Sequence, residues 1–262
     1  PWLSAAIARG TMPLAPLQLA ENNISVAHAV ELVGALRAGA PSLRELDLSG
    51  NPVCGVEEGG KDEFSTELVE ALCAWVQEEG TALTSLSLVD VALCGLARDG
   101  NGSYQSQAIS LLVELLGSGH GPLRSLTITG CRVQEDEALD LGKALSKNDT
   151  LERLLADRTP LAVQQLLCGE RLNLNGLDFS EVDASLMAQL LVHNATLTCA
   201  DLGGAKPLAR EIKILSDSFA RCRFQLQELS VAGRLLGLEG AASLLDALKE
   251  CPLQVLDLTG NE

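Results

Sequence analysis

One spacing of aliphatic residues recurs along this chain and limits how it can fold. In the clearest copy, residues 43–53, leucines stand at positions one, four and six, Asn51 at position nine and Val53 at position eleven. Side chains at positions four and six of an extended segment point to the same side, and the residue between them points to the other side. The spacing therefore predicts a short strand with one buried face, followed by a turn at Asn51.

The same spacing occurs about nine times, which makes an internal repeat the dominant feature of the sequence. The copies begin at Leu14, Leu43, Leu83, Leu123, Leu151, Leu174, Leu197, Leu226 and Leu253. Successive copies are about 29, 40, 40, 28, 23, 23, 29 and 27 residues apart, and the fifth to seventh match more weakly. Apolar residues between the copies follow a helical period, for example in 26–36, 64–75, 109–116 and 244–248. Each unit is therefore predicted to be a strand followed by a helix.

Such a unit cannot bury both its strand leucines and its helix stripe alone, so neighbouring units must stack. Position nine is expected to join them, because an Asn or Cys side chain there can bond to the backbone of the adjacent turn. Asn22, Asn51, Cys131 and Asn261 meet this expectation. Less regular turns are expected where the residue differs, at Val91, Thr159, Val182, Ala205 and Arg234.

The repeat resembles the leucine-rich repeat family, and segment 236–248 with the long helical half resembles its ribonuclease-inhibitor-like subfamily. This resemblance covers essentially the whole chain. It implies an α/β fold, a leucine-rich-repeat solenoid (horseshoe) with a parallel β-sheet on the concave face and helices on the convex face. We expect residues 1–262 to form a single domain of about nine repeats. Neither end has a polar capping unit, so we also expect a fragment of a longer array.

Charge restricts the partners that this chain can bind. It has 19 Lys and Arg against 35 Asp and Glu, a formal net charge of −16. Such a surface excludes nucleic acid and an anionic membrane as expected partners and favours a protein partner with a basic surface. No apolar stretch is long enough to span a bilayer. The eight cysteines lack paired spacing and are expected to be reduced, so the predicted location is cytoplasmic.

The residue between positions four and six is predicted to lie on the concave sheet face. This column reads Gln18, Asp47, Ser87, Thr127, Leu155, Asp178, Asp201, Ser230 and Asp257, and flanking columns add Glu45, Arg153, Asp157, Ser180 and Glu228. The predicted protein-binding residues are Glu45, Asp47, Ser87, Thr127, Asp157, Asp178, Asp201, Glu228 and Asp257. The alternative is that the recurring Leu-Asp-Leu pattern only solvates the strands.

The two long spacings indicate insertions after two consecutive strands, from Asn51 to about Asp62 and from Cys94 to about Ser103. Equivalent insertions in successive repeats should emerge side by side on one rim. Both begin with Cys-Gly, and Cys54 and Cys94 could pair, although reduced packing is the expectation. The insertions either bind a partner or are tolerated length variation, and the sequence leaves both readings open.

Neither insertion predicts a cofactor or a metal ion. The sequence of the first insertion is similar to a phosphate-binding loop, but Asp62 stands where a Ser or Thr would hold magnesium. The second starts like a calcium loop, but Tyr104 and Ser110 replace the required Gly and Glu. The three histidines, His28, His120 and His193, lie in different repeats, so no catalytic group is predicted.

These features together predict a non-catalytic protein-interaction module or scaffold, and the chain is expected to be part of a larger assembly. The family resemblance allows cytoskeletal or ciliary scaffolds, innate sensors and inhibitors of other enzymes. The alternative is a GTPase-activating protein, because some proteins with this repeat type resemble it and activate the GTPase Ran. Arg98 or Arg132 on the loops would then be the groups to test.

Overall fold

The computed structural model describes residues 2–8, 14–60, 62–119, 121–219, 221 and 226–261. The chain divides into two compact units, each built from strands and helices in alternation. Unit 1 comprises residues 1–133 and 147–156, and unit 2 comprises residues 134–146 and 157–262. No helix in these described ranges has the length and apolar character needed to cross a membrane.

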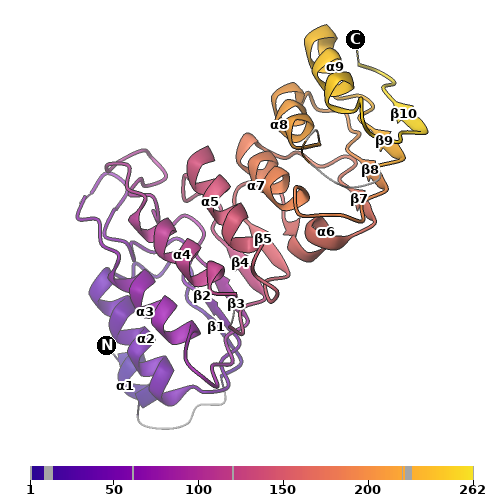
Figure 1. The fold of residues 1–262 in the computed structure, drawn as a ribbon. Coiled ribbons are helices and arrows are strands. Elements are labelled where there is room, and N and C mark those ends of the chain that lie inside the picture. Colours follow the sequence, from indigo (N-terminus) through magenta and orange to yellow (C-terminus); the bar gives the residue numbers. More distant parts are fainter. Residues whose placement is uncertain are drawn as a thin grey trace. The chain divides into compact units, whose positions relative to one another are not determined.

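Unit 1 contains five parallel strands, ordered β1 to β5 as in the sequence. Its helices pack one after another along one side of the strands (Figure 1). The elements are α1 (Trp2–Ala8), β1 (Pro16–Gln18), α2 (Val26–Gly39), β2 (Glu45–Asp47), α3 (Glu67–Val76), β3 (Ser85–Ser87), α4 (Gln107–Gly117), β4 (Ser125–Thr127) and β5 (Arg153–Leu155). The central leucines Leu17, Leu46, Leu86, Leu126 and Leu154 lie in one register across the sheet.

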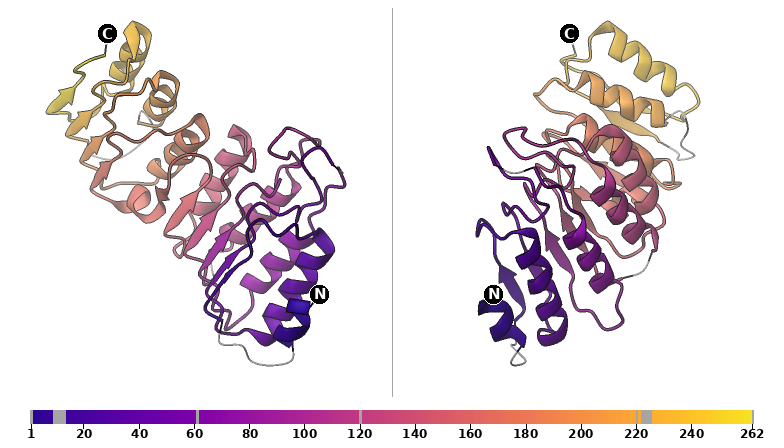
Figure 2. Two further views of the ribbon diagram at one scale, coloured as in Figure 1. Left: turned by 180° about the vertical axis from the view of Figure 1, so that it is seen from behind. Right: turned by 90° about the vertical axis from the view of Figure 1, so that its left-hand side faces the viewer.

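Unit 2 repeats this arrangement with four parallel strands, β7 to β10 (Figure 2). Helices α5, α7, α8 and α9 pack in that order. The elements are α5 (Glu135–Leu145), β6 (Leu161–Ala162), α6 (Val163–Cys168), β7 (Arg171–Asn173), α7 (Glu181–Leu191), β8 (Cys199–Asp201), α8 (Ala209–Phe219), β9 (Glu228–Ser230), α9 (Gly237–Ala247) and β10 (Val255–Asp257).

The core lies between the strands and the helices of each unit. In α4, for example, Ala108, Ile109, Leu112, Leu115 and Leu116 form the buried stripe, as their spacing along a helix requires. Parallel strands that alternate with helices, with buried central leucines in register, confirm the predicted α/β fold of the leucine-rich-repeat solenoid type.

Asn51 joins the first two repeats of unit 1. Its Oδ1 accepts the backbone N–H groups of Asn22 (2.9 Å) and Ile24 (3.0 Å). Its Nδ2 donates to the carbonyl oxygens of Leu19 (2.8 Å), Leu48 (2.9 Å) and Ser49 (3.1 Å). The side chain is only 1% exposed, so these bonds satisfy backbone groups of two turns away from water.

Other residue types perform the same task elsewhere. The thiol of Cys131 donates to the carbonyl of Leu88, with 3.0 Å between sulfur and oxygen. Position nine therefore connects adjacent turns in this repeat too, as predicted for a Cys side chain.

In unit 2 the position is taken by Arg234, which is fully buried. Its Nε donates to the carbonyl of Leu202 (2.5 Å), and its Nη2 donates to those of Gly203 (2.8 Å) and Leu177 (3.0 Å). The guanidinium also lies 5.6 Å from the ring centroid of Phe179. A single arginine therefore connects three successive turns, whereas the sequence only indicated an irregular one.

The repeat predicted to begin at Leu174 is placed five residues too late. Strand β7 ends at Asn173, so Leu174 occupies position six and Gly169 position one. Position nine falls on Leu177, whereas the predicted Val182 lies in α7. The cause is a short repeat, in which helix α6 has only six residues and Gly169 removes the first leucine of the pattern.

Replacing Leu126 by Ala is expected to destabilise unit 1 by about 2–5 kcal/mol, because this 1%-exposed side chain fills the core between two strands and the helices. Replacing the half-buried neighbour Thr127 by Ala is the control and should cost less than about 1 kcal/mol. Urea unfolding followed by circular dichroism measures both. Equal losses would show that the assignment of inward and outward residues in β4 is wrong.

Candidate functional site

The open face of unit 1 is formed by the first and third residues of its strands, whose central residues are buried. Four predicted binding residues lie on it. Asp47, Ser87 and Thr127 form one row in strand register, and Glu45 stands in the neighbouring row. Asp47, Ser87 and Thr127 are half-buried and Glu45 is exposed, so all four can be reached by a partner.

The open face of unit 2 is built in the same way from β7 to β10. Three predicted residues, Asp201, Glu228 and Asp257, are strand residues on this face. Asn173 and Ser230 complete the row that contains Asp201 and Asp257. The Arg171 guanidinium lies 3.9 Å from the Glu228 carboxylate, so one of the acidic groups has a basic neighbour.

Two predicted residues do not lie in the strands. Asp178 stands between β7 and α7, because the repeat around it was predicted five residues too late. Asp157 follows β5 by two residues and belongs to unit 2. Ser180, predicted for a flanking column, is the N-cap of α7. The prediction that Asp178 belongs to the central strand column is therefore wrong, whereas Asp157 stands two residues after β5, at the flanking position that its frame predicts.

Asp178 is also not a free carboxylate. Lys206 Nζ lies 2.5 Å from its Oδ2, and Arg158 Nη1 lies 3.6 Å from its Oδ1. The hydrogen bond from Lys206 is the main cause that lowers the pKa of Asp178 below the usual aspartate value. This carboxylate therefore has two basic partners within its own unit.

The aspartates in the third strand position have a structural task in addition to their charge. Oδ1 of Asp47 accepts the N–H of Ser49 (2.9 Å), and Oδ1 of Asp201 accepts that of Gly203 (3.0 Å). Asp257 does the same with Thr259, whose hydrogen bonds lower the pKa of this carboxyl.

Asn173 accepts the N–H of Asn175 at 3.0 Å in the same geometry. A neutral amide oxygen therefore supports this turn as a carboxylate does. The negative charge at the other three positions is not needed for the turn and remains available for a partner.

The two insertions lie side by side in unit 1, as predicted. The N–H of Gly59 donates to Oδ2 of Asp99 (2.7 Å), and Nδ2 of Asn101 donates to the carbonyl of Glu57 (2.7 Å). Each loop closes with an equivalent antiparallel bridge, Val56 with Asp62 and Leu96 with Gly102. Beneath them Val56 packs with Ala92, Ala97 and Phe64. Phe64 thus belongs to the loop base and not to the helix predicted for 64–75, which begins at Glu67.

The insertion cysteines Cys54 and Cys94 are both buried and are not joined by a disulfide. Burial is the main cause that raises the pKa of the Cys54 thiol, and the neighbouring Cys131 and Cys94 add to it. Burial likewise raises the pKa of Cys131 to about 11. Thiols with raised pKa values form little thiolate at neutral pH, so these groups are packing residues rather than nucleophiles.

The other chemical candidates do not converge on one site. Both carboxylate oxygens of Asp99 accept backbone N–H groups, those of Asn101 and Gly59, so this residue holds the loops. His120 lies outside the described residues. His28, in α2, forms a hydrogen bond with Ser25, the residue that precedes this helix. Among the residues that the structure describes, no group of three or more His, Cys, Asp or Glu is arranged to hold a metal ion.

The loop arginines lie in neighbouring repeats. Nη2 of Arg132 donates to the carbonyl of Arg98 at 2.9 Å, and both side chains are exposed. Arg132 therefore fixes the backbone of the second insertion.

A buried carboxylate that the predicted site does not include stands at the start of α7. Oδ2 of Asp183 accepts the N–H groups of Arg158, Thr159 and Ser180, each at 3.1 Å. The Ser-x-x-Asp spacing of residues 180–183 is the sequence signal for this capping arrangement. Burial raises the pKa of Asp183 despite these three hydrogen bonds.

No model of a known protein family matches the chain, and no curated protein sequence matches it. A leucine-rich repeat-containing protein, LegL7 from Legionella pneumophila, is similar in structure, with 21% identity and a TM-score of 0.42 over 94% of this chain and 66% of that one.

Two enzymes resemble the chain more weakly. They are the 3-keto-D-glucoside 4-epimerase YcjR from E. coli (12% identity, TM-score 0.23, 94% of this chain and 91% of that one) and the carboxyl transferase domain of Rhizobium etli pyruvate carboxylase (15%, 0.28, 98% and 42%). Likenesses with TM-scores below 0.5 do not transfer an activity.

Replacing Asp183 by Asn is expected to leave unit 2 at least as stable at pH 7, because the amide oxygen can accept the same N–H groups without burying a charge. A folded-state pKa above the unfolded one means that this residue's contribution is fully present in acid and declines as pH rises through the folded pKa. The Asn variant should therefore lose less stability than wild type between about pH 4 and pH 7.

Asp183→Ala is the contrasting variant and should cost about 2–4 kcal/mol in urea unfolding, because it leaves three buried N–H groups without an acceptor. An Asn variant as unstable as the Ala variant would show that the charge itself stabilises this turn.

Proposed function

We propose that this protein is a non-catalytic interaction module or scaffold that binds a protein partner through the open faces of its sheets and its rim loops. The observation that carries the proposal is the row of third-position residues in each unit. Asp47, Asp201 and Asp257 are half-buried residues of the open faces and carry a charge that their turns do not require. Such a row can form hydrogen bonds and ion pairs with a folded partner without disturbing the repeat.

The partner is proposed to present a basic surface. Net charge of −16 supports this, because complementary charge accelerates association and aligns the two proteins. The same charge disfavours nucleic acid and anionic membranes. The described cysteines Cys54, Cys73 and Cys131, which are buried and not in disulfides, fit the proposed cytoplasmic location, where thiols stay reduced. We propose that both units act together as one array of repeats within a larger assembly.

No contact of Arg98 or Arg132 in the described residues favours the GTPase-activating alternative over this function.

Affinity capture with the triple variant Asp47→Asn, Asp201→Asn and Asp257→Asn tests the proposal. The amides keep the turn hydrogen bonds and remove the charge. At residue 201 the new amide nitrogen replaces the oxygen that accepts Nδ2 of Asn175, and a turn of the Asn175 amide restores that bond, so the variant should fold as wild type does. We expect a partner captured by wild type to bind this variant at least about tenfold more weakly. Mass spectrometry identifies the partner, and titration of the purified pair measures the change.

The matched control is Glu31→Gln, Glu114→Gln and Asp217→Asn, which removes three negative charges from exposed positions on helices α2, α4 and α8. It should bind as wild type does. Equal binding by the triple face variant and wild type would contradict the assignment of the open faces as the binding surface.

A further inference from the structure

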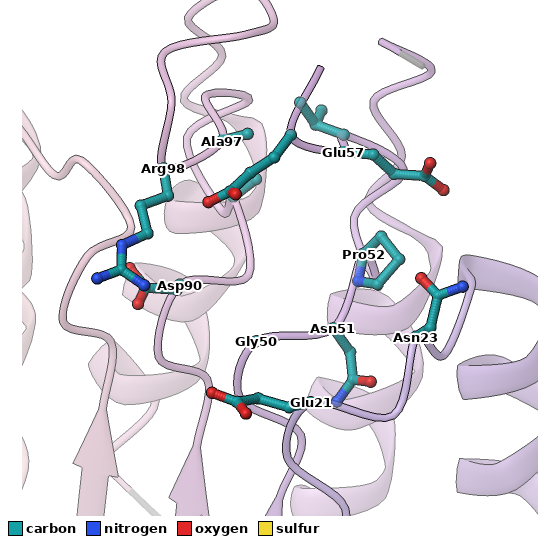
Figure 3. A pocket seen from close by; sticks show the side chains of 12 residues that line it. Glu21, Asn23, Gly50, Asn51, Pro52, Glu57, Asp90, Ala97 and Arg98 are labelled. Atoms are coloured by element: carbon teal, nitrogen blue, oxygen red, sulfur yellow. The ribbon is translucent and has the colours of Figure 1, made fainter. Parts of the chain in front are cut away.

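A pocket opens in unit 1 where the chain leaves β1, β2 and β3. Its volume is about 370 Å³, and it is lined both by residues that follow these strands and by both insertion loops (Figure 3). The acidic lining residues are Glu21, Glu57, Glu58 and Asp90, and the apolar ones are Pro52, Val56, Ala92 and Ala97. Three successive repeats therefore contribute residues to one open pocket.

Glu21 and Asp90 stand at an unusual position, three residues after β1 and β3. The backbone there is left-handed, with φ of +57° and +53°, because each N–H bonds to a carbonyl of the next repeat. In six other repeats this residue is glycine. The angle φ lies between +65° and +77° at Gly50, Gly130, Gly176, Gly233 and Gly260, and is +158° at Gly204. Glycine adopts this conformation without strain, so folding alone gives no reason for a carboxylate at either position.

The carboxylates alternate with glycines along unit 1. A Cβ on Gly50 would lie 3.0 Å from Cγ of Glu21, and one on Gly130 would lie 1.8 Å from Oδ1 of Asp90. Each acidic side chain therefore occupies the space that the next repeat leaves open. Gly50, between Glu21 and Asp90, keeps this part of the pocket unfilled.

The residues that line the pocket favour binding of a cationic group carried on an apolar chain. The lining contains four carboxylates and one guanidinium, that of Arg98, which lies beside Asp90 in Figure 3. None of the four carboxylates takes part in an ion pair of the described residues, which leave out Lys61. A planar guanidinium can bridge several carboxylates with its five N–H donors. Val56, Ala92 and Ala97 can pack against the methylene groups behind it.

We infer that this pocket receives an arginine side chain of the protein partner. The inference rests on the proposed function and adds the chemistry of the residue that is recognised. Arg98 lies beside Asp90 in Figure 3 and competes for the same carboxylates. Its removal therefore strengthens binding of an incoming arginine, whereas loss of the lining carboxylates weakens it.

The probe is the peptide acetyl-Gly-Arg-Gly-amide, titrated into the isotope-labelled full chain and followed by amide chemical shifts. We expect shifts at Gly50, Gly59 and Ala92 with a dissociation constant of about 1–10 mM, as suits one side chain. The same peptide with citrulline, which has the shape of arginine without its charge, should give no saturable shifts. Saturable shifts with citrulline, or none with arginine, would overturn the inference.

Three variants sharpen the test. Glu21→Gly with Asp90→Gly installs the residue that other repeats carry, so its urea midpoint should not fall, while its affinity for the arginine peptide should fall at least about tenfold. Arg98→Ala should bind the peptide about threefold more tightly. Glu31→Gln with Glu114→Gln, outside the pocket, should bind as wild type does. Unchanged affinity in the first variant would overturn the inference.

The two tests fail independently. If the arginine peptide does not bind, the result of partner capture with the open-face variant is unaffected. Conversely, unchanged capture by those variants would contradict the proposed sheet surface while the pocket titration still reports on arginine recognition.

Discussion

The Asn51 side chain accepts two hydrogen bonds from the backbone and donates three to it, and these five bonds join the turns of two successive repeats in unit 1. A turn at the end of every short strand exposes backbone groups that no strand or helix can satisfy. Burying them between stacked repeats would cost about 1–3 kcal/mol for each unpaired group. The side chain at position nine removes this cost, and stacking then buries the leucines of strands and helices together.

The solution is not tied to one residue type. Cys131 donates a weaker thiol hydrogen bond to the preceding turn, and Arg234 reaches carbonyl groups of the two preceding turns. The arginine requires Gly204 beside it, because a Cβ there would lie 2.7 Å from the guanidinium carbon. Burial lowers the pKa of Arg234, whereas Asp178 and Asp201 oppose this shift and help to keep the guanidinium charged. Asp178 and Asp201 thus also stabilise the charge of a buried arginine in unit 2.

The same turns determine which groups the protein can offer to a partner. Because Asp47, Asp201 and Asp257 cap the turn with one oxygen, their positions are fixed before any partner arrives. Fixed carboxylates lose little conformational freedom on binding, which favours recognition by a rigid face. In unit 1 the insertion loops extend this face with a pocket whose acidic residues stand in left-handed turns.

Much of this architecture is predictable from the spacing of leucines alone. Strand and helix order, the inward and outward rows, and the neighbouring insertions follow from the repeat. The frame around Leu174 does not, because a six-residue helix shortens the fifth repeat and Gly169 removes the leucine that would mark its start. Asp178 was misplaced for the same reason. Glu21 and Asp90 were omitted, although an acidic residue where other repeats carry glycine was a visible signal. The structural role of Arg234 could not be predicted, because its side chain bonds to the backbone of turns that lie far from it in the sequence.

Amide hydrogen exchange of Asn22 and Ile24 in wild type and Asn51→Ala tests most directly whether position nine holds the turns. Both N–H groups donate to the Asn51 side chain, so their protection should fall at least about tenfold in the variant, while the amides of β9 and β10 in unit 2 should keep theirs. Asn51→Asp keeps the acceptor oxygen but loses the three donated bonds and places a buried oxygen against three carbonyl oxygens, so it should not retain the protection. Unchanged protection of Asn22 and Ile24 in Asn51→Ala would contradict the central role given to this side chain.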